Sequence, residues 1–218
     1  MKALKIIAFI IGFVMIFFGM GGFLSSFATA ATDKSGMMVS SVPINQVNGI
    51  AVDSIGQIYI GDGQSSCIQV FSNTGQFMYG FAFATGGAGY FAFGIDDEDI
   101  IHIVTARTES YFQYMNGKCI DSESIDYSRQ EQLEEDYNMR RDNQYSSQDK
   151  KYFVSSRNQI TIHDLSSKTE ERVELDTPFW PLSIFTYWLI NAVGIGLWFW
   201  SFAWKLVKST KSFYKIKS

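Results

Sequence analysis

The sequence is poor in the residue groupings that most catalytic and metal sites need. It holds two histidines, His102 and His163, and two cysteines, Cys67 and Cys119. A zinc site needs three or four ligands, and the sequence has no Gly-x-Ser-x-Gly elbow, no cysteine with a neighbouring histidine and no phosphate-binding glycine loop. We therefore expect no catalytic residue, no metal site and no cofactor, and we predict that the protein is not an enzyme.

Acidic residues are absent from both ends of the chain. All 22 Asp and Glu lie between Asp33 and Asp176, whereas seven of the 18 Lys and Arg lie outside that segment. The central segment therefore has 11 basic against 22 acidic residues, and its net charge is −11. Such a charge repels phosphates, so we expect no nucleic-acid partner.

Two uncharged apolar runs border the central segment, from Ile6 to Phe27 and from Pro178 to Trp204. Each is long enough to cross the roughly 30 Å hydrocarbon layer of a bilayer as a helix. Basic flanks stay on the cytoplasmic side, so we expect a cell-membrane protein with its central domain outside and its C-terminus in the cytoplasm. The first run is either a lasting helix or a signal peptide, because Ala28-Thr29-Ala30 has the form of a cleavage site.

The expected organisation has four parts. They are a signal peptide or transmembrane helix (1–32), an extracytoplasmic β domain (33–177), a transmembrane helix (178–204) and a basic cytoplasmic tail (205–218). Small residues on both apolar runs, including Ala8, Gly12 and Gly19 on the first, predict that the two helices touch if the first is retained.

Tryptophans and lysines mark the edges of the second apolar run. An aromatic belt at the two membrane surfaces is predicted from Trp180, Trp198, Trp200 and Trp204. Contact with anionic lipid is predicted from four lysines spaced three to four residues apart, Lys205, Lys208, Lys211 and Lys215. The alternative role of these lysines is a stop-transfer flank that fixes the orientation.

Alternating apolar residues and turn signals predict four short strands between Val47 and Phe77. Strands this close in sequence pair through hairpin loops and form a meander. One apolar face is expected from Ile50, Val52, Ile58, Ile60, Ile68, Val70 and Phe77.

The same order of strands and turns recurs in a second unit, and a third unit supplies three more strands. Ile101-His102-Ile103 stands 43 residues after Ile58-Tyr59-Ile60, and Tyr152-Phe153-Val154 stands a further 51 residues on. A period of about 40 to 50 residues with four strands per unit is typical of propeller blades. The sequence therefore predicts a mainly β fold, a short array of about three four-stranded antiparallel propeller-like blades, flanked by N- and C-terminal transmembrane helices.

The first unit resembles an NHL repeat. That blade type has a Gly-Ile-Ala-Val-Asp strand, a Gly-x-Ile-Tyr-Val strand and an Ile-Gln-Val-Phe strand. The matching residues here are Gly49 to Asp53, Gly56 to Ile60, Asp62, Ile68 to Phe71 and Gly75 to Phe77. The match departs at Cys67, where the family usually has Arg, and the second and third units keep only the strand order. The resemblance implies an NHL-like propeller fold and a binding role.

The number of blades creates a difficulty. The resemblance implies a closed ring of about six blades, but the segment from Asp33 to Thr177 supplies only about three. An open arc exposes sheet edges that pair with other chains. We therefore expect the edges to be covered by a second copy of the chain, by another protein or by local structure.

A polar insertion at residues 126–150 separates the second and third units. Residues 128–141 lack Gly and Pro and predict a helix, with acids early and Arg140-Arg141 late. Its apolar face is thin, with Leu133, Tyr137 and either Met139 or Arg140, so we expect a solvated insertion between blades.

Two further groups leave alternatives open. Asp96-Asp97-Glu98-Asp99 could bind calcium, but it lacks the alternating ligand pattern of a calcium loop, so a solvated turn is expected. Cys67 and Cys119 could form one disulfide in an exported domain. The alternative is two unpaired thiols packed in strands.

These features predict a membrane-anchored binding or scaffolding module that mediates protein–protein interaction. A first alternative is an extracytoplasmic small-molecule or cation sensor, which predicts a polar cavity where Asp96 to Asp99 or the histidines converge. A second is a propeller-type hydrolase or lyase, which needs several histidines and carboxylates directed at one centre.

Overall fold

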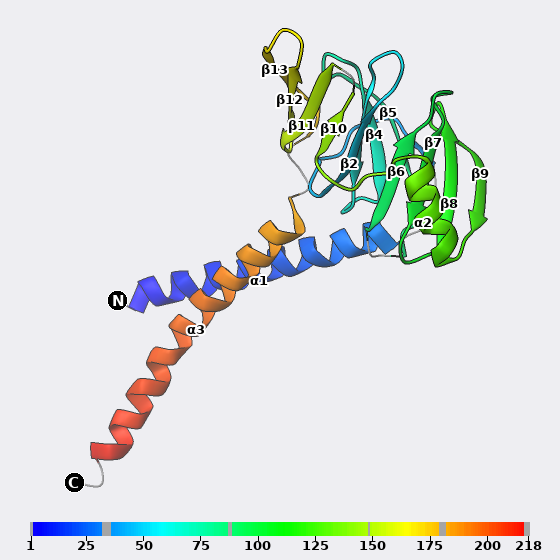
Figure 1. Cartoon of the computed structure of the whole chain (residues 1–218). Helices are drawn as coiled ribbons and strands as arrows, with labels where there is room; N and C mark the ends of the chain where they lie inside the picture. The colour runs from blue at the N-terminus through cyan, green and yellow to red at the C-terminus, as the bar shows by residue number, and fades with distance from the viewer. Residues whose placement is uncertain (1, 32–35, 87–88, 148, 179–181, 216–218) are drawn as a thin grey trace. The chain divides into compact units, whose positions relative to one another are not determined.

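The computed structural model describes residues 2–31, 36–86, 89–147, 149–178 and 182–215, with the side chains of residues 3–25, 36–86, 89–147, 149–178 and 182–201 (Figure 1). It divides into two compact units. The helical unit comprises Met1–Ser25 and Leu182–Ser218, and the β unit comprises Ser26–Pro181.

Two long helices belong to the helical unit, α1 (Lys2–Ala31) and α3 (Ile184–Lys215). The segments Ala3–Ser25 and Ile184–Ser201 are long and apolar enough to cross a membrane by length and composition. The second helix was expected to start at Pro178 and end near Trp204. It starts at Ile184 instead, and its backbone stays helical through the basic residues to Lys215.

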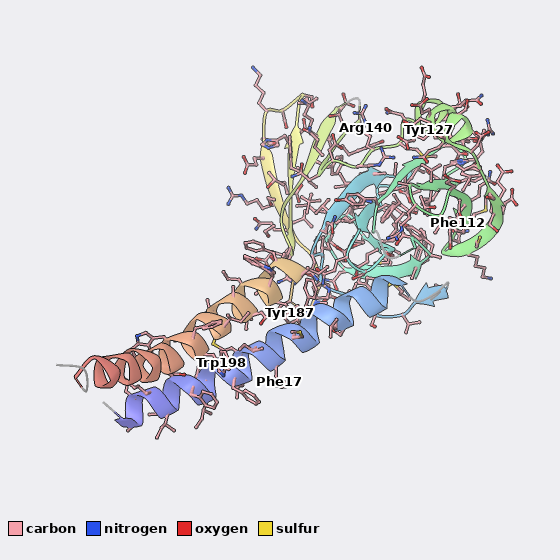
Figure 2. The ribbon with its side chains drawn as sticks, turned by 90° about the horizontal axis from the view of Figure 1, so that it is seen from below. Phe17, Phe112, Tyr127, Arg140, Tyr187 and Trp198 are labelled. Carbon is pink, nitrogen blue, oxygen red and sulfur yellow. The ribbon has the colours of Figure 1, made fainter. Side chains whose placement is uncertain are left out.

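Small residues let α1 and α3 pack closely, which confirms the predicted contact. A Cβ atom on Gly12 would lie 2.8 Å from the Gly194 carbonyl oxygen, and one on Gly19 would lie 2.8 Å from the Tyr187 carbonyl oxygen. The Tyr187 ring occupies the space over Gly22, and this tyrosine is 1% exposed (Figure 2). Glycine is required at these positions because any side chain would overlap the opposite helix.

Three antiparallel sheets form the β unit (Figure 1). Sheet 1 contains β2 (Val47–Val52), β3 (Ile58–Asp62), β4 (Cys67–Phe71) and β5 (Phe77–Ala82), with the short β1 (Gly36–Met38) paired to β5. Sheet 2 contains β6 (Phe91–Ile95), β7 (Ile101–Thr105), β8 (Ser110–Met115) and β9 (Lys118–Ser124). Sheet 3 contains β10 (Gln144–Ser146), β11 (Lys150–Ser156), β12 (Gln159–Asp164) and β13 (Glu170–Glu174). Each sheet keeps the up-and-down strand order of a propeller blade.

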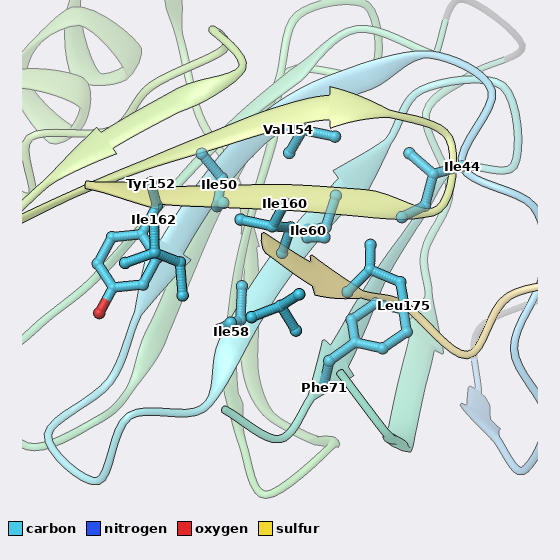
Figure 3. Close-up of a cluster of buried hydrophobic side chains, with 11 residues drawn as sticks. Ile44, Ile50, Ile58, Ile60, Phe71, Tyr152, Val154, Ile160, Ile162 and Leu175 are labelled. Carbon is cyan, nitrogen blue, oxygen red and sulfur yellow. The ribbon is translucent and has the colours of Figure 1, made fainter. Parts of the chain in front are cut away.

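Sheet 1 lies between the other two sheets. One of its faces packs on sheet 3, where Ile58 and Ile60 meet Ile160 (Figure 3). The other face packs on sheet 2, where Tyr59 and Ile68 meet Phe91. In a propeller array that follows chain order, sheet 2 would be the middle one, so the predicted consecutive array is corrected.

The expected single apolar face of the first unit is also corrected. Ile58 pairs with Phe71 and Gly61 pairs with Ile68 across β3 and β4, and directly paired residues share a face. Ile68 and Val70 therefore face sheet 2, whereas Ile50, Ile58 and Ile60 face sheet 3. Sheet 1 is buried on both faces, as its continuous apolar strands require.

The polar insertion proves to be neither wholly helical nor wholly solvated. Helix α2 (Tyr127–Asp136) starts after Asp126, whose Oδ1 accepts a hydrogen bond from the Arg129 N–H at 2.8 Å. It ends before Arg141 because Asn138 adopts a left-handed φ of 46°, and the end of the insertion forms β10. Leu133 and Met139 are buried against sheet 2, so α2 covers the outer face of that sheet.

A buried carboxylate ties the chain before β2 to sheet 1. Asp62 is fully buried; its Oδ1 accepts hydrogen bonds from the N–H groups of Asn45 and Gln46, and its Oδ2 accepts one from Ser65. Burial raises the pKa of Asp62, and these hydrogen bonds oppose that shift. This residue of the NHL-like motif therefore has a structural role.

We expect Gly12→Leu to separate α1 from α3, because the new side chain would overlap the Gly194 backbone. The cost should be about 1–3 kcal/mol, as in other overpacked contacts. Cross-linking in membranes between cysteines introduced at the buried positions Ala8 and Ser201 should fall. Gly21→Leu is the matched control, since nothing lies within 4 Å of a Cβ at Gly21. Equal cross-linking in both variants would contradict the packing.

We expect Leu133→Ala to lower the free energy of unfolding by about 2–5 kcal/mol, because Leu133 is 1% exposed and fills the contact between α2 and sheet 2. Urea unfolding of the detergent-solubilised protein measures the change. Leu165→Ala removes the same atoms from a side chain that is 49% exposed and should cost less than about 0.5 kcal/mol. A similar loss in both variants would show that α2 does not stabilise the β unit.

Candidate functional site

A cleft of about 400 Å³ opens where the three sheets meet. Its walls come from the β2–β3 turn of sheet 1, the β6–β7 turn of sheet 2, and β10 and β11 of sheet 3. The lining residues are Val52, Asp53, Ser54, Gly56, Ile95, Asp96, Asp97, Asp99, Tyr145, Ser147 and Tyr152. All three sheets thus contribute to one polar cavity.

Asp53 shapes the wall from sheet 1. Its Oδ1 accepts hydrogen bonds from the Ile55 N–H at 3.1 Å and the Gln57 N–H at 2.7 Å, and its Oδ2 accepts one from the Tyr59 hydroxyl at 3.1 Å. These contacts hold the β2–β3 turn closed, which is an ordinary structural use of Asp in a turn. They also fix the position of the carboxylate in the cleft wall.

The acidic turn of sheet 2 forms the opposite wall. Asp96 Oδ1 accepts hydrogen bonds from the N–H groups of Glu98 and Ile100. Asp99 has a φ of 59° and reaches across to sheet 1, where it accepts hydrogen bonds from the Ser54 N–H at 3.0 Å and the Ser54 hydroxyl at 2.6 Å. A solvated turn was expected at Asp96 to Asp99. The turn is instead linked to sheet 1 through Asp99.

Asp97 differs from the other carboxylates of the cleft. It is exposed, and no residue in the described part of the chain forms a hydrogen bond with its side chain. Its carboxylate is thus available to an incoming group, whereas those of Asp53, Asp96 and Asp99 already accept hydrogen bonds.

His102 lies behind Asp96 and is 2% exposed. Its Nε2 is 2.8 Å from Asp96 Oδ2, its Nδ1 is 2.6 Å from the Tyr111 hydroxyl, and its ring stacks on Tyr137 with the centroids 3.5 Å apart. Partial burial is the largest single effect and raises the pKa of Asp96, but the hydrogen bond from His102 together with the backbone hydrogen bonds from Ile100 and Glu98 outweighs it and leaves that pKa lowered. Burial raises the pKa of Tyr111 to about 12, so its hydroxyl stays protonated. His102 thereby positions an ionised carboxylate in the cleft wall.

Two tyrosines of sheet 3 complete the cleft. Tyr145 and Tyr152 lie with their ring centroids 6.1 Å apart, and burial raises the pKa of both. Tyr152 is 8% exposed, yet neither hydroxyl has a hydrogen-bond partner among the described residues. The site therefore presents phenol hydroxyls opposite aspartate carboxylates.

The remaining site residues from the sequence do not converge on the cleft. Cys67 is buried in β4 and Cys119 is exposed in β9; both thiols are free, so the disulfide considered above is not formed. Burial, with a smaller effect of Asp62, raises the pKa of Cys67. His163 lies in β12 against Phe153, apart from His102 in β7. The described residues include no group of three or more His, Cys, Asp or Glu placed to hold a metal ion.

The predicted membrane-edge residues lie in or near α3. Trp198 is half-buried and Trp200 is exposed, so both remain available for the predicted aromatic belt. Trp180 lies outside the described residues, and so do the side chains of the other predicted contacts, Trp204, Lys205, Lys208, Lys211 and Lys215.

Tyr145 and Tyr152 were not predicted as site residues. Tyr152 was placed in a strand, but alternation along β11 does not show that the ring borders a cavity. Tyr145 stands alone among polar residues in the insertion, and an isolated aromatic of this kind was the one available signal.

No protein-family model matches the chain, and no curated protein is similar to it. Virginiamycin B lyase from Staphylococcus aureus is a similar solved structure, with a TM-score of 0.35 and 12% identity over 67% of this chain and 47% of the lyase. A streptogramin B lyase has a TM-score of 0.35 and 10% identity over 71% of this chain and 49% of its own. A protein of unknown function from Bacteroides caccae has a TM-score of 0.30 and 9% identity over 57% of this chain and 48% of its own.

The chain spans about half the length of these structures. None of them is described as an NHL protein. The prediction that the protein is not an enzyme is contradicted, because two of the matches are lyases.

The Asp96–His102 contact predicts a pH dependence of stability. Because the pKa of Asp96 is lowered on folding, its contribution is present above the ordinary carboxyl pKa and is lost as the pH falls through the lowered value. Urea unfolding between about pH 5 and pH 3 should show a shallower loss of stability for Asp96→Asn than for the parent protein. Asp97→Asn is the control, because it removes the same charge from a side chain that forms no hydrogen bond with a described residue. Its stability should change with pH as that of the parent protein does. Identical slopes in all three proteins would contradict this account.

Proposed function

We propose that the protein is a membrane-anchored binding protein that holds its β unit outside the cell, and that the cleft between the three sheets is its binding site. The observation that carries this proposal is the cleft itself, since a cavity built by three separate sheets with unused polar groups is where a ligand is expected.

Anchoring is supported by two helices with the length and composition of membrane spans. The outside position of the β unit is supported by charge. Lys2 and Lys5 lie at the N-terminal end of the first helix and five lysines follow the second span, while all acidic residues lie between the two helices. Basic flanks are retained in the cytoplasm, so both ends of the chain should lie inside and the acidic unit outside.

Protein–protein interaction remains a second candidate function. The edge strand β9 has seven residues that are all exposed, and an unpaired strand edge can take a strand of another protein or of a second copy. The missing half of a propeller ring gives this function less support, because sheet 3 and α2 cover faces that an open array would leave bare.

The position of the cleft can be tested with one introduced thiol. Ser147→Cys in a Cys119→Ser background places a reactive group at the exposed rim of the cleft. We expect a membrane-impermeant maleimide to label this variant in intact cells, or in spheroplasts if an outer layer blocks access. Ser209→Cys in the same background should be labelled only after permeabilisation. The reverse pattern would overturn the proposed orientation.

The same thiol reports binding in the cleft. Small molecules of positive, neutral and negative charge are added to the purified full-length protein in detergent, and those that enter the cleft should slow the labelling of Ser147→Cys. Ser122→Cys on the exposed strand β9 is the matched control and should react at an unchanged rate. If no compound of any charge slows the reaction selectively, the cleft is not a binding site.

A further inference from the structure

We propose that the cleft binds a small organic cation, through an ammonium or guanidinium group held between the acidic turns and the two tyrosines. This inference rests on the proposed binding role of the cleft and adds the chemical class of its ligand.

The charge of the cleft has one sign. Its lining contains four aspartates, Asp53, Asp96, Asp97 and Asp99, and no Lys, Arg or His. Hydrogen bonds to backbone or side-chain groups hold three of these carboxylates in place, so they do not need to rearrange when a ligand arrives. Fixed charges of one sign in a cleft concentrate the opposite charge there. The net charge of −11 between Asp33 and Thr177 adds to that attraction.

The tyrosines supply an observation that is independent of the acidic residues. Tyr152 is more than nine-tenths buried, and its hydroxyl points away from the apolar side chains around it (Figure 3). No described residue satisfies that hydroxyl, although Tyr152 lines the cleft. The ring is buried but the hydroxyl oxygen itself is open to solvent at the cleft, where it can form a hydrogen bond with a ligand. The tilted pair of Tyr152 and Tyr145 also offers ring faces to a cation.

An organic cation fits these groups better than a metal ion does. Asp97 is the one cleft carboxylate without a described hydrogen bond, and a calcium ion requires six to eight oxygen ligands at once. No suitable group of three ligands exists among the described residues. A volume of about 400 Å³ is also in the range of small-molecule sites and far larger than a single ion.

Four simple probes test the proposal with the purified full-length protein in detergent. They are benzylamine, which is cationic at neutral pH, benzyl alcohol, benzoate and calcium chloride, and binding is measured by calorimetry. We expect benzylamine to bind more tightly than the other three. Its binding should weaken several-fold when sodium chloride is raised from about 0.05 M to about 0.5 M, because salt screens charges near the surface.

Two pairs of variants locate the site. Asp97→Asn should weaken benzylamine binding about threefold to tenfold. Glu98 is the next residue, and its exposed side chain does not line the cleft. Glu98→Gln removes the same charge and should change benzylamine binding less than about twofold. Tyr152→Phe should weaken it about fivefold by removing the hydroxyl. Tyr90→Phe, at a residue that is 56% exposed, should have no effect.

The outcomes separate the ligand class from the binding role. Tighter binding of benzyl alcohol, benzoate or calcium at the cleft would overturn the cationic ligand and leave the cleft as a binding site. Equal effects of Asp97→Asn and Glu98→Gln would overturn the assignment of Asp97. If none of the four probes binds and no compound protects Ser147→Cys from labelling, the binding role of the cleft is overturned as well.

Discussion

Sheet 1 carries apolar side chains on both faces, and a different sheet buries each face. Burial of apolar surface is the dominant favourable contribution to folding, so this double contact organises the β unit. Sheet 3 packs directly on sheet 1, although sheet 2 and α2 lie between the two sheets in the sequence. The innermost strands β2, β6 and β10 are consequently neighbours, with β2 in contact with both of the others.

The cleft follows from that arrangement. Because the three inner strands lie together, the turns that leave β2 and β6 meet beside the start of sheet 3. Asp99 and Ser54 bond the two turns to each other, and His102 holds Asp96 from behind. The site is thus supported by the sheets themselves, and three of its four aspartates are positioned before any ligand is present. Such preorganisation reduces the ordering that binding would otherwise require.

Local structure was predictable from the sequence where it depended on neighbouring residues. Alternation and turn signals identified β2 to β9 and β11 to β13, and Asp96 to Asp99 were recognised as a turn with a candidate role in a cavity. β10 was missed because Gln144 and Ser146 are polar and the strand is short. The order of the sheets was also missed, because the sequence pattern of β3 and β4 indicates which residues are apolar but not which face each one joins. The contribution of Tyr145 and Tyr152 to the cleft depends on that tertiary arrangement and could not be seen locally.

Helix α2 limits where further blades could be added to the β unit. It occupies the outer face of sheet 2, where one more blade would otherwise stack, and it is polar on the side turned away from the sheet. Terminal elements of repeat proteins have this character, since they end a stack while keeping it soluble. Growth by blade duplication is therefore blocked at sheet 2, and a longer relative of this chain would have to add its blades beyond sheet 3 or first lose the helix.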